Sequence, residues 1–218
     1  MTATAHKANQ QYFRQAYRTG QHGWETEQPS PFVLKYLKKL FSLVPDGKCL
    51  DIGCGEGRHA IAAAKSGFKV DGIDTEPLAL RRARQFAQRH QAKGIRFAVA
   101  DALRLPFPPV SFDLVIDYGC LHHQRKSDWL VYRANLLRVL KPGGYYVLSV
   151  FSPHFRLFHG SHRPWHIAMG AYRRYFTKNE IVNLFGNDFR IITLVEQKDD
   201  GGFWHVFMER CERQAAPP

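Results

Sequence analysis

A glycine-rich segment between an apolar strand pattern and a helical pattern constrains the fold more than any other feature of this chain. Residues 51–57 are Asp-Ile-Gly-Cys-Gly-Glu-Gly, and they connect the apolar segment 49–52 to the Ala-rich segment 58–66. Glycines at alternate positions permit backbone conformations that side chains forbid, and they allow close approach of a ligand. In open parallel sheets, such a loop lies at the carboxyl end of a strand, where ligands bind.

The rest of the chain continues this alternation of strands and helices. The predicted strands are 49–52, 68–74, 95–99, 112–117 and 145–151, and the predicted helices are 31–44, 58–66, 77–92, 129–140 and 177–185. Ser30 is expected to cap the first helix, and Thr177 with Glu180 to form a capping box on the last. Two final strands, 189–196 and 203–209, are separated by six residues, too few for a helical crossover. The sequence therefore predicts an α/β fold: a doubly wound, seven-stranded, mostly parallel sheet with its last strand antiparallel.

Composition is typical of globular proteins, and a chain of 218 residues forms one large domain or two small ones; we expect a single domain. Of the 218 residues, 44% are hydrophobic, and no apolar run approaches the roughly 18–20 residues that span a bilayer. The amino terminus is polar, so we expect no signal peptide, and the four cysteines form no Cys-x-x-Cys pair, which favours free thiols in the cytoplasm. We expect residues 1–47 to form a lid and a leading helix, 48–218 the core, and 153–176 a cap inserted over the substrate.

Two common nucleotide-binding patterns do not fit the loop. A dinucleotide loop requires a glycine at position 58, which is Arg58, and the phosphate-binding Gly-Lys-Ser/Thr ending is absent. An acid nevertheless follows at the right place, because Asp74 ends the second strand 21 residues after Gly53. A carboxylate at this position accepts hydrogen bonds from the hydroxyls of a ribose.

This combination resembles the nucleoside-binding signature of the class I S-adenosylmethionine-dependent methyltransferases. The 51–57 loop is similar to that family's first motif, Asp74 to its ribose acid, and the segments 100–102 and 140–144 to two later motifs. The resemblance implies S-adenosylmethionine as cofactor and in-line methyl transfer that needs no metal. It assigns the cofactor to Asp51, Gly53, Cys54, Gly55, Gly57, Asp74, Thr75, Asp101, Ala102, Asp117 and Tyr118.

The methyl acceptor is expected to be a small molecule. Residues 117–123 contain neither the Asn/Asp-Pro-Pro-Tyr/Phe run of base and glutamine N-methylating enzymes nor the Pro-Cys nucleophile of cytosine C-methylating enzymes. The segment 24–31 is similar to the Trp-Asp-x-Gly-x-Pro segment of thiopurine and tellurite-resistance methyltransferases, with Glu27 where glycine is usual. We expect methylation at sulfur, nitrogen or oxygen, and an amino-terminal lid that contains Tyr12, Tyr17 and Trp24.

His122 and His123 follow the fourth strand and are the candidates for a general base, since histidine titrates near neutral pH. The alternative is that they only bind backbone or cofactor, and a thiol acceptor would need no base. In the cap, Trp165 and Arg173 are expected to contact substrate, although simple packing would also explain the aromatic residues there. Three cap histidines (159, 162 and 166) match no metal-site spacing, so no metal is expected.

The chain carries an excess of positive charge. Its formal net charge is +12, and residues 125–174 hold nine Lys and Arg against one acid, Asp128. A basic rim near the active site would attract an anionic substrate, whereas scattered surface arginines would have no such role. A second basic stretch, 81–96, belongs mainly to a helix, and a solvated helix face is the default interpretation there. An RNA methyltransferase that uses the basic surface as a whole is the less favoured alternative. A third possibility is a cofactor-binding protein without catalysis.

Overall fold

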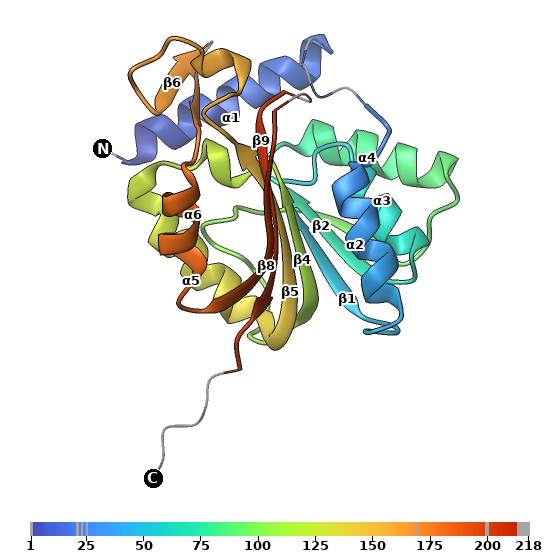
Figure 1. Ribbon diagram of the computed structural model, residues 1–218. Coiled ribbons are helices and arrows are strands. Elements are labelled where there is room, and N and C mark those ends of the chain that lie inside the picture. Colours follow the sequence, from blue (N-terminus) through green and yellow to red (C-terminus); the bar gives the residue numbers. More distant parts are fainter. Residues whose placement is uncertain are drawn as a thin grey trace.

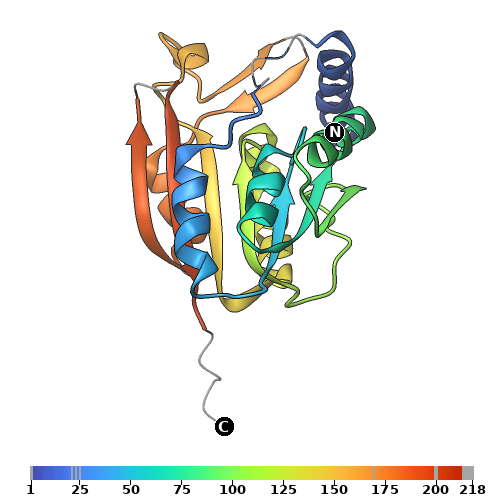
Figure 2. The same cartoon turned by 90° about the vertical axis from the view of Figure 1, so that its right-hand side faces the viewer.

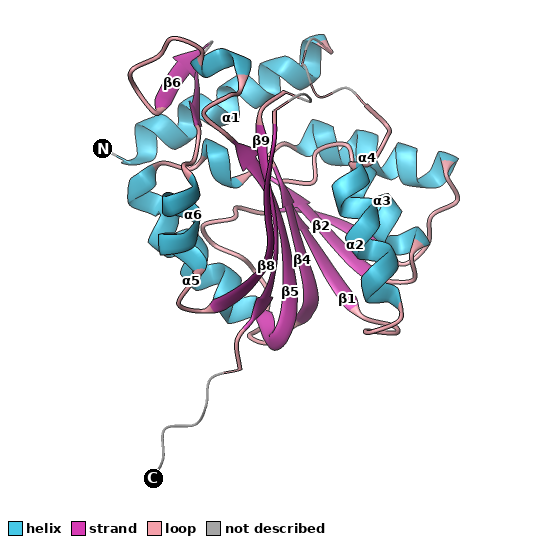
Figure 3. Cartoon of the chain, in the orientation of Figure 1, coloured by secondary structure: helices cyan, strands magenta, loops and turns pink. Residues whose placement is uncertain are grey.

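A seven-stranded sheet separates two helical layers in the computed structural model, which describes residues 2–20, 22, 24, 26–168, 170–198 and 201–212 (Figures 1 and 3). The strand order is β3-β2-β1-β4-β5-β9-β8. The strands are β1 (Lys48–Ile52), β2 (Lys69–Asp74), β3 (Ile95–Val99), β4 (Phe112–Tyr118), β5 (Leu140–Phe151), β8 (Phe189–Gln197) and β9 (Phe203–Arg210).

The first five strands are parallel, and β9 runs antiparallel to both of its neighbours, β5 and β8. This confirms the predicted sheet and its antiparallel last strand. The chain winds outward from β1 through β2 to β3, and it then returns to place β4 on the other side of β1. Between β1 and β4 the winding direction reverses, and the crevice at the carboxyl ends there is where such sheets bind ligands.

The helices cover both faces of the sheet. On one face lie α2 (Pro31–Phe41), α3 (Arg58–Lys65) and α4 (Pro77–Arg89), and α2 and α3 are seen in front of the sheet in Figure 2. On the other lie α5 (Trp129–Val139) and α6 (Lys178–Phe185) (Figure 1). Each face buries its own apolar cluster, with Leu37 and Phe207 in one and Leu136 and Phe185 in the other. The two cores hold the strand ends in place.

Two further elements lie beyond the carboxyl ends of the strands. Helix α1 (Thr2–Thr19) crosses this edge, and the hairpin of β6 (Trp165–Ala168) and β7 (Ala171–Arg174) lies beside it (Figure 1). Neither element was predicted: the amino-terminal segment was expected only as a lid, and 153–176 only as an irregular cap. Helix α1 is polar overall, so its sequence does not stand out as that of a core helix.

Local predictions hold at some helix ends and fail at others. The capping box on α6 is confirmed, since Thr177 and Glu180 make both of its hydrogen bonds. The side chain of Ser30 makes no capping bond, and its backbone N–H instead donates to Nε2 of His59 at 3.1 Å. Strand β5 begins at Leu140 and not at the predicted residue 145, so the segment 140–144 is an irregular start of the strand. Glu25 of the segment 24–31 and the core's last residues, 213–218, lie outside the described residues.

Candidate functional site

The loop after β1 has the left-handed backbone that its glycines predict. The φ angles of Gly53, Gly55 and Gly57 are 67°, 54° and 84°. A Cβ atom at Gly53 would lie 2.8 Å from the Cβ of Cys120, and one at Gly55 would lie 2.8 Å from the hydroxyl of Tyr17. Other residues would be strained in these conformations and would also collide with neighbours, so the loop requires glycine.

Asp74 connects this loop to the end of β2. Its Oδ2 accepts a hydrogen bond from the N–H of Gly55, and its Oδ1 accepts one from the N–H of Glu76, both at 2.9 Å. Thr75, between them in the chain, is half-buried. Burial raises the pKa of Asp74, while these backbone donors lower it. A carboxylate oxygen has two lone pairs, so each oxygen retains capacity to accept a ligand hydroxyl.

Asp51 is a buried carboxyl with an unused oxygen. The residue is 2% exposed, and within the described part of the chain its Oδ2 has no hydrogen-bond partner. Burial raises the pKa of Asp51 to about 8, and the nearby Asp117 adds to the shift. A buried polar atom without a partner is rare in native proteins, because its lost hydration is not replaced. The free oxygen therefore suits a ligand that brings a positively charged donor.

Asp117 is held by the protein's own groups. Its Oδ1 accepts from the N–H of Cys120 at 2.7 Å. Its Oδ2 accepts from the N–H of Leu121 at 3.0 Å and from the hydroxyl of Tyr132 at 2.5 Å. The residue is fully buried, and burial raises its pKa to about 6. Asp117 thus fixes the turn that precedes the two histidines.

The other residues assigned to the cofactor are not all in one place. Cys54 belongs to the loop, and Asp101 follows β3, where its Oδ1 accepts from the N–H of Leu103 at 2.9 Å. Ala102 is 6% exposed and packs in the core below α5. Tyr118 lies on the opposite face of β4 from Asp117, with Arg58 5.1 Å from its ring centroid. The structure thus brings the loop and Asp74 together and places Ala102 and Tyr118 in packing positions.

The two histidines occupy the short helix η1 (Leu121–His123) and differ in their hydrogen bonds. Nδ1 of His122 accepts the N–H of Phe151 at 3.3 Å, and its ring stacks on that phenyl ring at 3.6 Å. Nδ1 of His123 lies 2.9 Å from the carbonyl oxygen of Tyr172. Since a carbonyl can only accept, Nδ1 of His123 carries the proton and Nε2 is left as the basic nitrogen.

Both imidazoles are neutral near pH 7. Burial lowers the pKa of His123 to about 4, with Arg173 adding to the shift and the bond to Tyr172 opposing it. Burial also lowers the pKa of His122 well below its usual value, and His123 and Arg173 contribute. A neutral imidazole with an unprotonated Nε2 is the form that can accept a proton, so His123 has the geometry of a base and His122 does not.

Helix α1 binds the histidine turn and β7 through one side chain. The Nδ2 amide of Asn9 donates to the carbonyl of His123 at 3.0 Å, and its Oδ1 accepts the N–H of Tyr172 at 2.7 Å. Phe13 packs edge-to-face on the His123 ring, with centroids 4.9 Å apart. No local pattern singles out Asn9, because its partners lie 114 and 163 residues away in the chain.

The three aromatic residues expected in the amino-terminal segment do gather near the loop. Nε1 of Trp24 donates to the hydroxyl of Tyr17 at 3.1 Å, and the carbonyl of Tyr17 accepts from Arg82 of α4 at 2.7 Å. Burial raises the pKa of the Tyr17 hydroxyl well above its usual value. Tyr12 lies under Arg173, 4.7 Å from its guanidinium carbon to the ring centroid. Helix α1 thus carries this aromatic cluster over Gly55 and toward β7.

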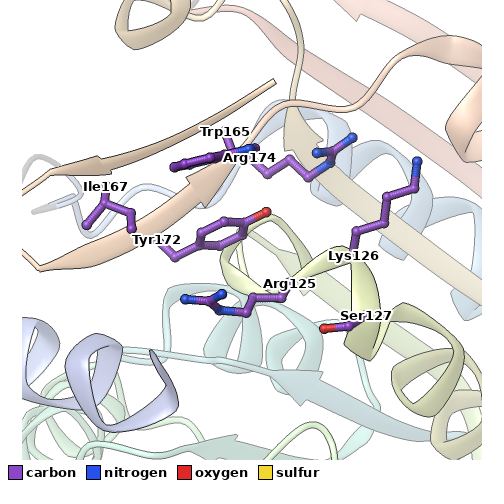
Figure 4. A pocket seen from close by; sticks show the side chains of 7 residues that line it. All are labelled: Arg125, Lys126, Ser127, Trp165, Ile167, Tyr172 and Arg174. Atoms are coloured by element: carbon purple, nitrogen blue, oxygen red, sulfur yellow. The ribbon is translucent and has the colours of Figure 1, made fainter. Parts of the chain in front are cut away.

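The two residues expected to contact substrate from the cap lie on opposite faces of the hairpin. Trp165 pairs with Arg174, and Arg173 pairs with His166, so successive residues of β7 point to opposite sides. Arg173 faces α1 and the histidines. Trp165 instead lies with Tyr172 and Arg174 on the side away from them (Figure 4). The structure therefore does not join Trp165 to the other predicted site residues.

Within the described part of the chain, no three His, Cys, Asp or Glu side chains are grouped as a metal site would require. No helix there has the length and apolar character needed to cross a membrane.

Comparison with known proteins assigns the strand-and-loop region to a class. Residues 49–144 match the family model described as a methyltransferase domain. A 2-methyl-6-phytyl-1,4-hydroquinone methyltransferase of Synechocystis sp. is 39% identical over 111 residues, which are 50% of this chain and 34% of the relative. A demethylmenaquinone methyltransferase of Tropheryma whipplei is 34% identical over 127 residues, which are 55% of this chain and 51% of the relative.

Among solved structures, the fold is shared with a 1,6-didemethyltoxoflavin-N1-methyltransferase of Burkholderia thailandensis with bound 1,6-didemethyltoxoflavin and S-adenosylhomocysteine. The TM-score is 0.73 at 22% identity, over 94% of this chain and 88% of the other. Residues 49–144 therefore match a methyltransferase domain by sequence, and the solved structure shares the fold. The chain spans about half or less of the length of the two curated relatives above, so the activity of the whole protein needs its own argument.

Proposed function

We propose that this chain transfers the methyl group of S-adenosylmethionine to sulfur, nitrogen or oxygen of a small molecule. One observation carries the proposal. The left-handed glycine loop, the buried carboxyl of Asp51 and the half-buried carboxyl of Asp74 meet at the carboxyl ends of β1 and β2, beside the point between β1 and β4 where the sheet reverses its winding. The curated relatives that support it have names ending in methyltransferase, and both of those described above act on quinone-type molecules by name.

The residues present fit this cofactor. Asp74 has acceptor capacity for ribose hydroxyls, and the unpartnered Oδ2 of Asp51 suits the ammonium of the methionine portion. The glycines allow backbone approach to a ligand that lacks phosphate. When bound, the sulfonium supplies a methyl group already activated for displacement. We keep Cys54, Thr75 and Asp101 as cofactor-lining residues, while Asp117 acts by positioning the histidine turn and Ala102 and Tyr118 by packing.

The protein's own contribution is positioning, exclusion of water and, for a protonated acceptor, removal of a proton. Nε2 of His123 accepts the proton of an N–H or O–H acceptor, and the carbonyl of Tyr172 holds the ring in the required tautomer. His122 supports this ring from the adjacent position, with centroids 4.6 Å apart. A thiolate acceptor would require only the positioning.

Residues 1–47 supply a lid and the leading helix α2, residues 48–218 the core, and residues 153–176 a cap. The contacts of Asn9 and Tyr17 support a lid that closes over the loop and the histidine turn at once. Deletion of residues 1–22 should abolish turnover while the core stays folded. A truncated protein that turns over at the full rate would refute the lid.

The acceptor is proposed to be anionic, because Arg173 lies near both histidines on the inner face of the hairpin and lowers the pKa of each. A narrower likeness, to thiopurine and tellurite-resistance enzymes, depends only on the segment 24–31. The relatives described above have names that point to quinones and a toxoflavin precursor, so we propose the broader small-molecule class.

The basic stretch 81–96 gives little support to an RNA substrate. Half of its six cations form ion pairs with acids of this chain: Arg82–Glu56, Arg89–Glu27 and Arg96–Asp71. Paired cations release fewer counterions from a phosphate backbone, so the salt dependence of any RNA binding should be shallow.

Calorimetry with S-adenosylhomocysteine tests the proposal. We expect one site per chain in the wild type and at least about tenfold weaker binding in Asp74→Asn, because two ribose hydrogen bonds to a charged group are weakened. Asp71→Asn is the matched control on the same strand, since Asp71 pairs with Arg96. Folded wild-type protein that does not bind the compound would overturn the proposal, and binding without methyl transfer to any tested acceptor would favour the non-catalytic alternative.

A further inference from the structure

A groove of about 380 Å³ lies on the outer face of the β6–β7 hairpin, between the hairpin and the 125–127 turn (Figure 4). None of its lining residues belongs to the glycine loop, to the histidine turn or to α1. Strand β7 separates the groove from Arg173, which faces the other way. The groove is therefore a second concave surface, and it is large enough for a small molecule.

Aromatic and aliphatic side chains form the hairpin wall of the groove. The rings of Trp165 and Tyr172 are near parallel, at 23°, with centroids 6.4 Å apart. Trp165 is 37% exposed, and the adjacent Ile167 on the same face is 52% exposed. Large apolar side chains that line a concave surface and remain open to solvent offer area for a flat ring to cover.

Positive charge surrounds this apolar wall and exceeds the negative charge available to it. Arg125, Lys126 and Arg174 line the groove. Glu180 is shared by two of them, since its Oε1 lies 3.1 Å from Nζ of Lys126 and 2.6 Å from Nη2 of Arg174. Arg125 lies over the ring of Tyr172 at 5.4 Å and has no ion pair within the described part of the chain. Three cations thus face one carboxylate.

Arg174 adds an unused donor at the base of the groove. Its side chain is 7% exposed, yet its Nε has no hydrogen-bond partner among the residues that the structure describes. A buried N–H on a charged group without an acceptor is costly, and a ligand oxygen would satisfy it. This observation is independent of the charge count, and it also points to an anion.

We propose that this groove binds a small planar aromatic anion, whose ring covers the exposed side chains of Trp165 and Ile167 and whose carboxylate, sulfonate or phosphate lies between Arg125 and Arg174. The site goes beyond the proposed methyl transfer, because it lies on the far side of β7 from the histidines. It requires neither the cofactor nor a functional base.

Calorimetric titration of the full chain with 2-naphthoate tests the site. We expect binding to the wild type, and affinities at least about tenfold weaker for neutral 2-naphthalenemethanol and for hexanoate, which lack the charge and the ring respectively. Arg125→Gln and Trp165→Ala should each weaken 2-naphthoate binding by about tenfold or more, because they remove a charged donor and the ring surface. Arg81→Gln, an exposed arginine on α4, is the matched control and should bind as the wild type does.

The same proteins are titrated with S-adenosylhomocysteine, which separates the two proposals. Equal 2-naphthoate affinity in all variants, or displacement of 2-naphthoate by S-adenosylhomocysteine, would overturn the groove site. Loss of S-adenosylhomocysteine binding alone would count against the methyltransferase proposal and leave the groove site standing. Melting temperatures of the variants that match the wild type within a few degrees exclude misfolding as the cause of weaker binding.

Discussion

Replacing Asp51 by asparagine should stabilise the protein relative to the wild type, and this advantage should grow as the pH rises. The pKa of Asp51 is raised to about 8 in the folded chain from an ordinary value of 3.8. A carboxyl whose folded pKa is raised stabilises the fold below its unfolded pKa and loses that contribution as the pH rises through the folded pKa. Asparagine keeps the shape and one acceptor oxygen but cannot ionise. The variant therefore avoids the loss.

The magnitude follows from the pH interval. Both pH 5 and pH 7 lie between the unfolded and the folded pKa of Asp51. Over this interval, the difference in unfolding free energy between the variant and the wild type should grow by about 3 kcal/mol in favour of Asp51→Asn. In urea this corresponds to a relative shift of about 1 M or more in the midpoint. Subtracting the wild-type curve at each pH removes the contributions of the other titrating groups.

Urea unfolding at pH 5, 6 and 7 measures this difference directly. Asp46→Asn is the matched control, because Asp46 is exposed and has φ of 55°, a conformation that asparagine tolerates. Wild-type and Asp51→Asn curves that run parallel across this range would refute the reasoning, since they would mean that Asp51 is not a strained buried acid.

Three further outcomes are expected. Binding of S-adenosylhomocysteine at pH 7 should release about 0.9 proton from Asp51, because its pKa is about 8 in the free protein. The release should make the binding enthalpy depend on the ionisation enthalpy of the buffer. A wild-type binding enthalpy that is the same in all buffers would contradict this prediction. Gly55→Ala should be less stable than Gly20→Ala, because both have positive φ but only the first meets a neighbour within 4 Å, and equal melting temperatures would contradict the clash. His123→Gln should lower kcat about 100-fold or more for an N–H or O–H acceptor, because it removes the proposed base. His122→Gln should mainly lower the melting temperature. A reversal of these two effects would exclude His123 as the base.

The strand-and-loop part of the site could be predicted from sequence because its signals are local. Gly53, Gly55 and Gly57 are needed by the backbone itself, and Asp74 ends its strand at a fixed distance along the chain. The sheet was also predictable, since the alternation of apolar strands and helices leaves few topologies.

The outer part of the site was not predictable in the same way. The bonds of Asn9 and the contact of Tyr17 with the loop depend on tertiary packing between segments far apart in sequence. The opposite orientation of Trp165 and Arg173 follows from a hairpin that has no strong turn or alternation signal. The resemblance assigns Asp117 to the cofactor, whereas in the structure its oxygens accept hydrogen bonds from Tyr132 and two backbone amides.

The single amide of Asn9 has a consequence for the order of events in a reaction cycle. It makes both the bond to the histidine turn and the bond to β7, so withdrawal of α1 breaks them in one movement. The residue that would remove the proton and the strand that fixes its tautomer then become accessible to solvent together. Under the proposed function, opening of α1 would therefore expose the cofactor loop and the base together, while the bond from His123 to the carbonyl of Tyr172 stays in place.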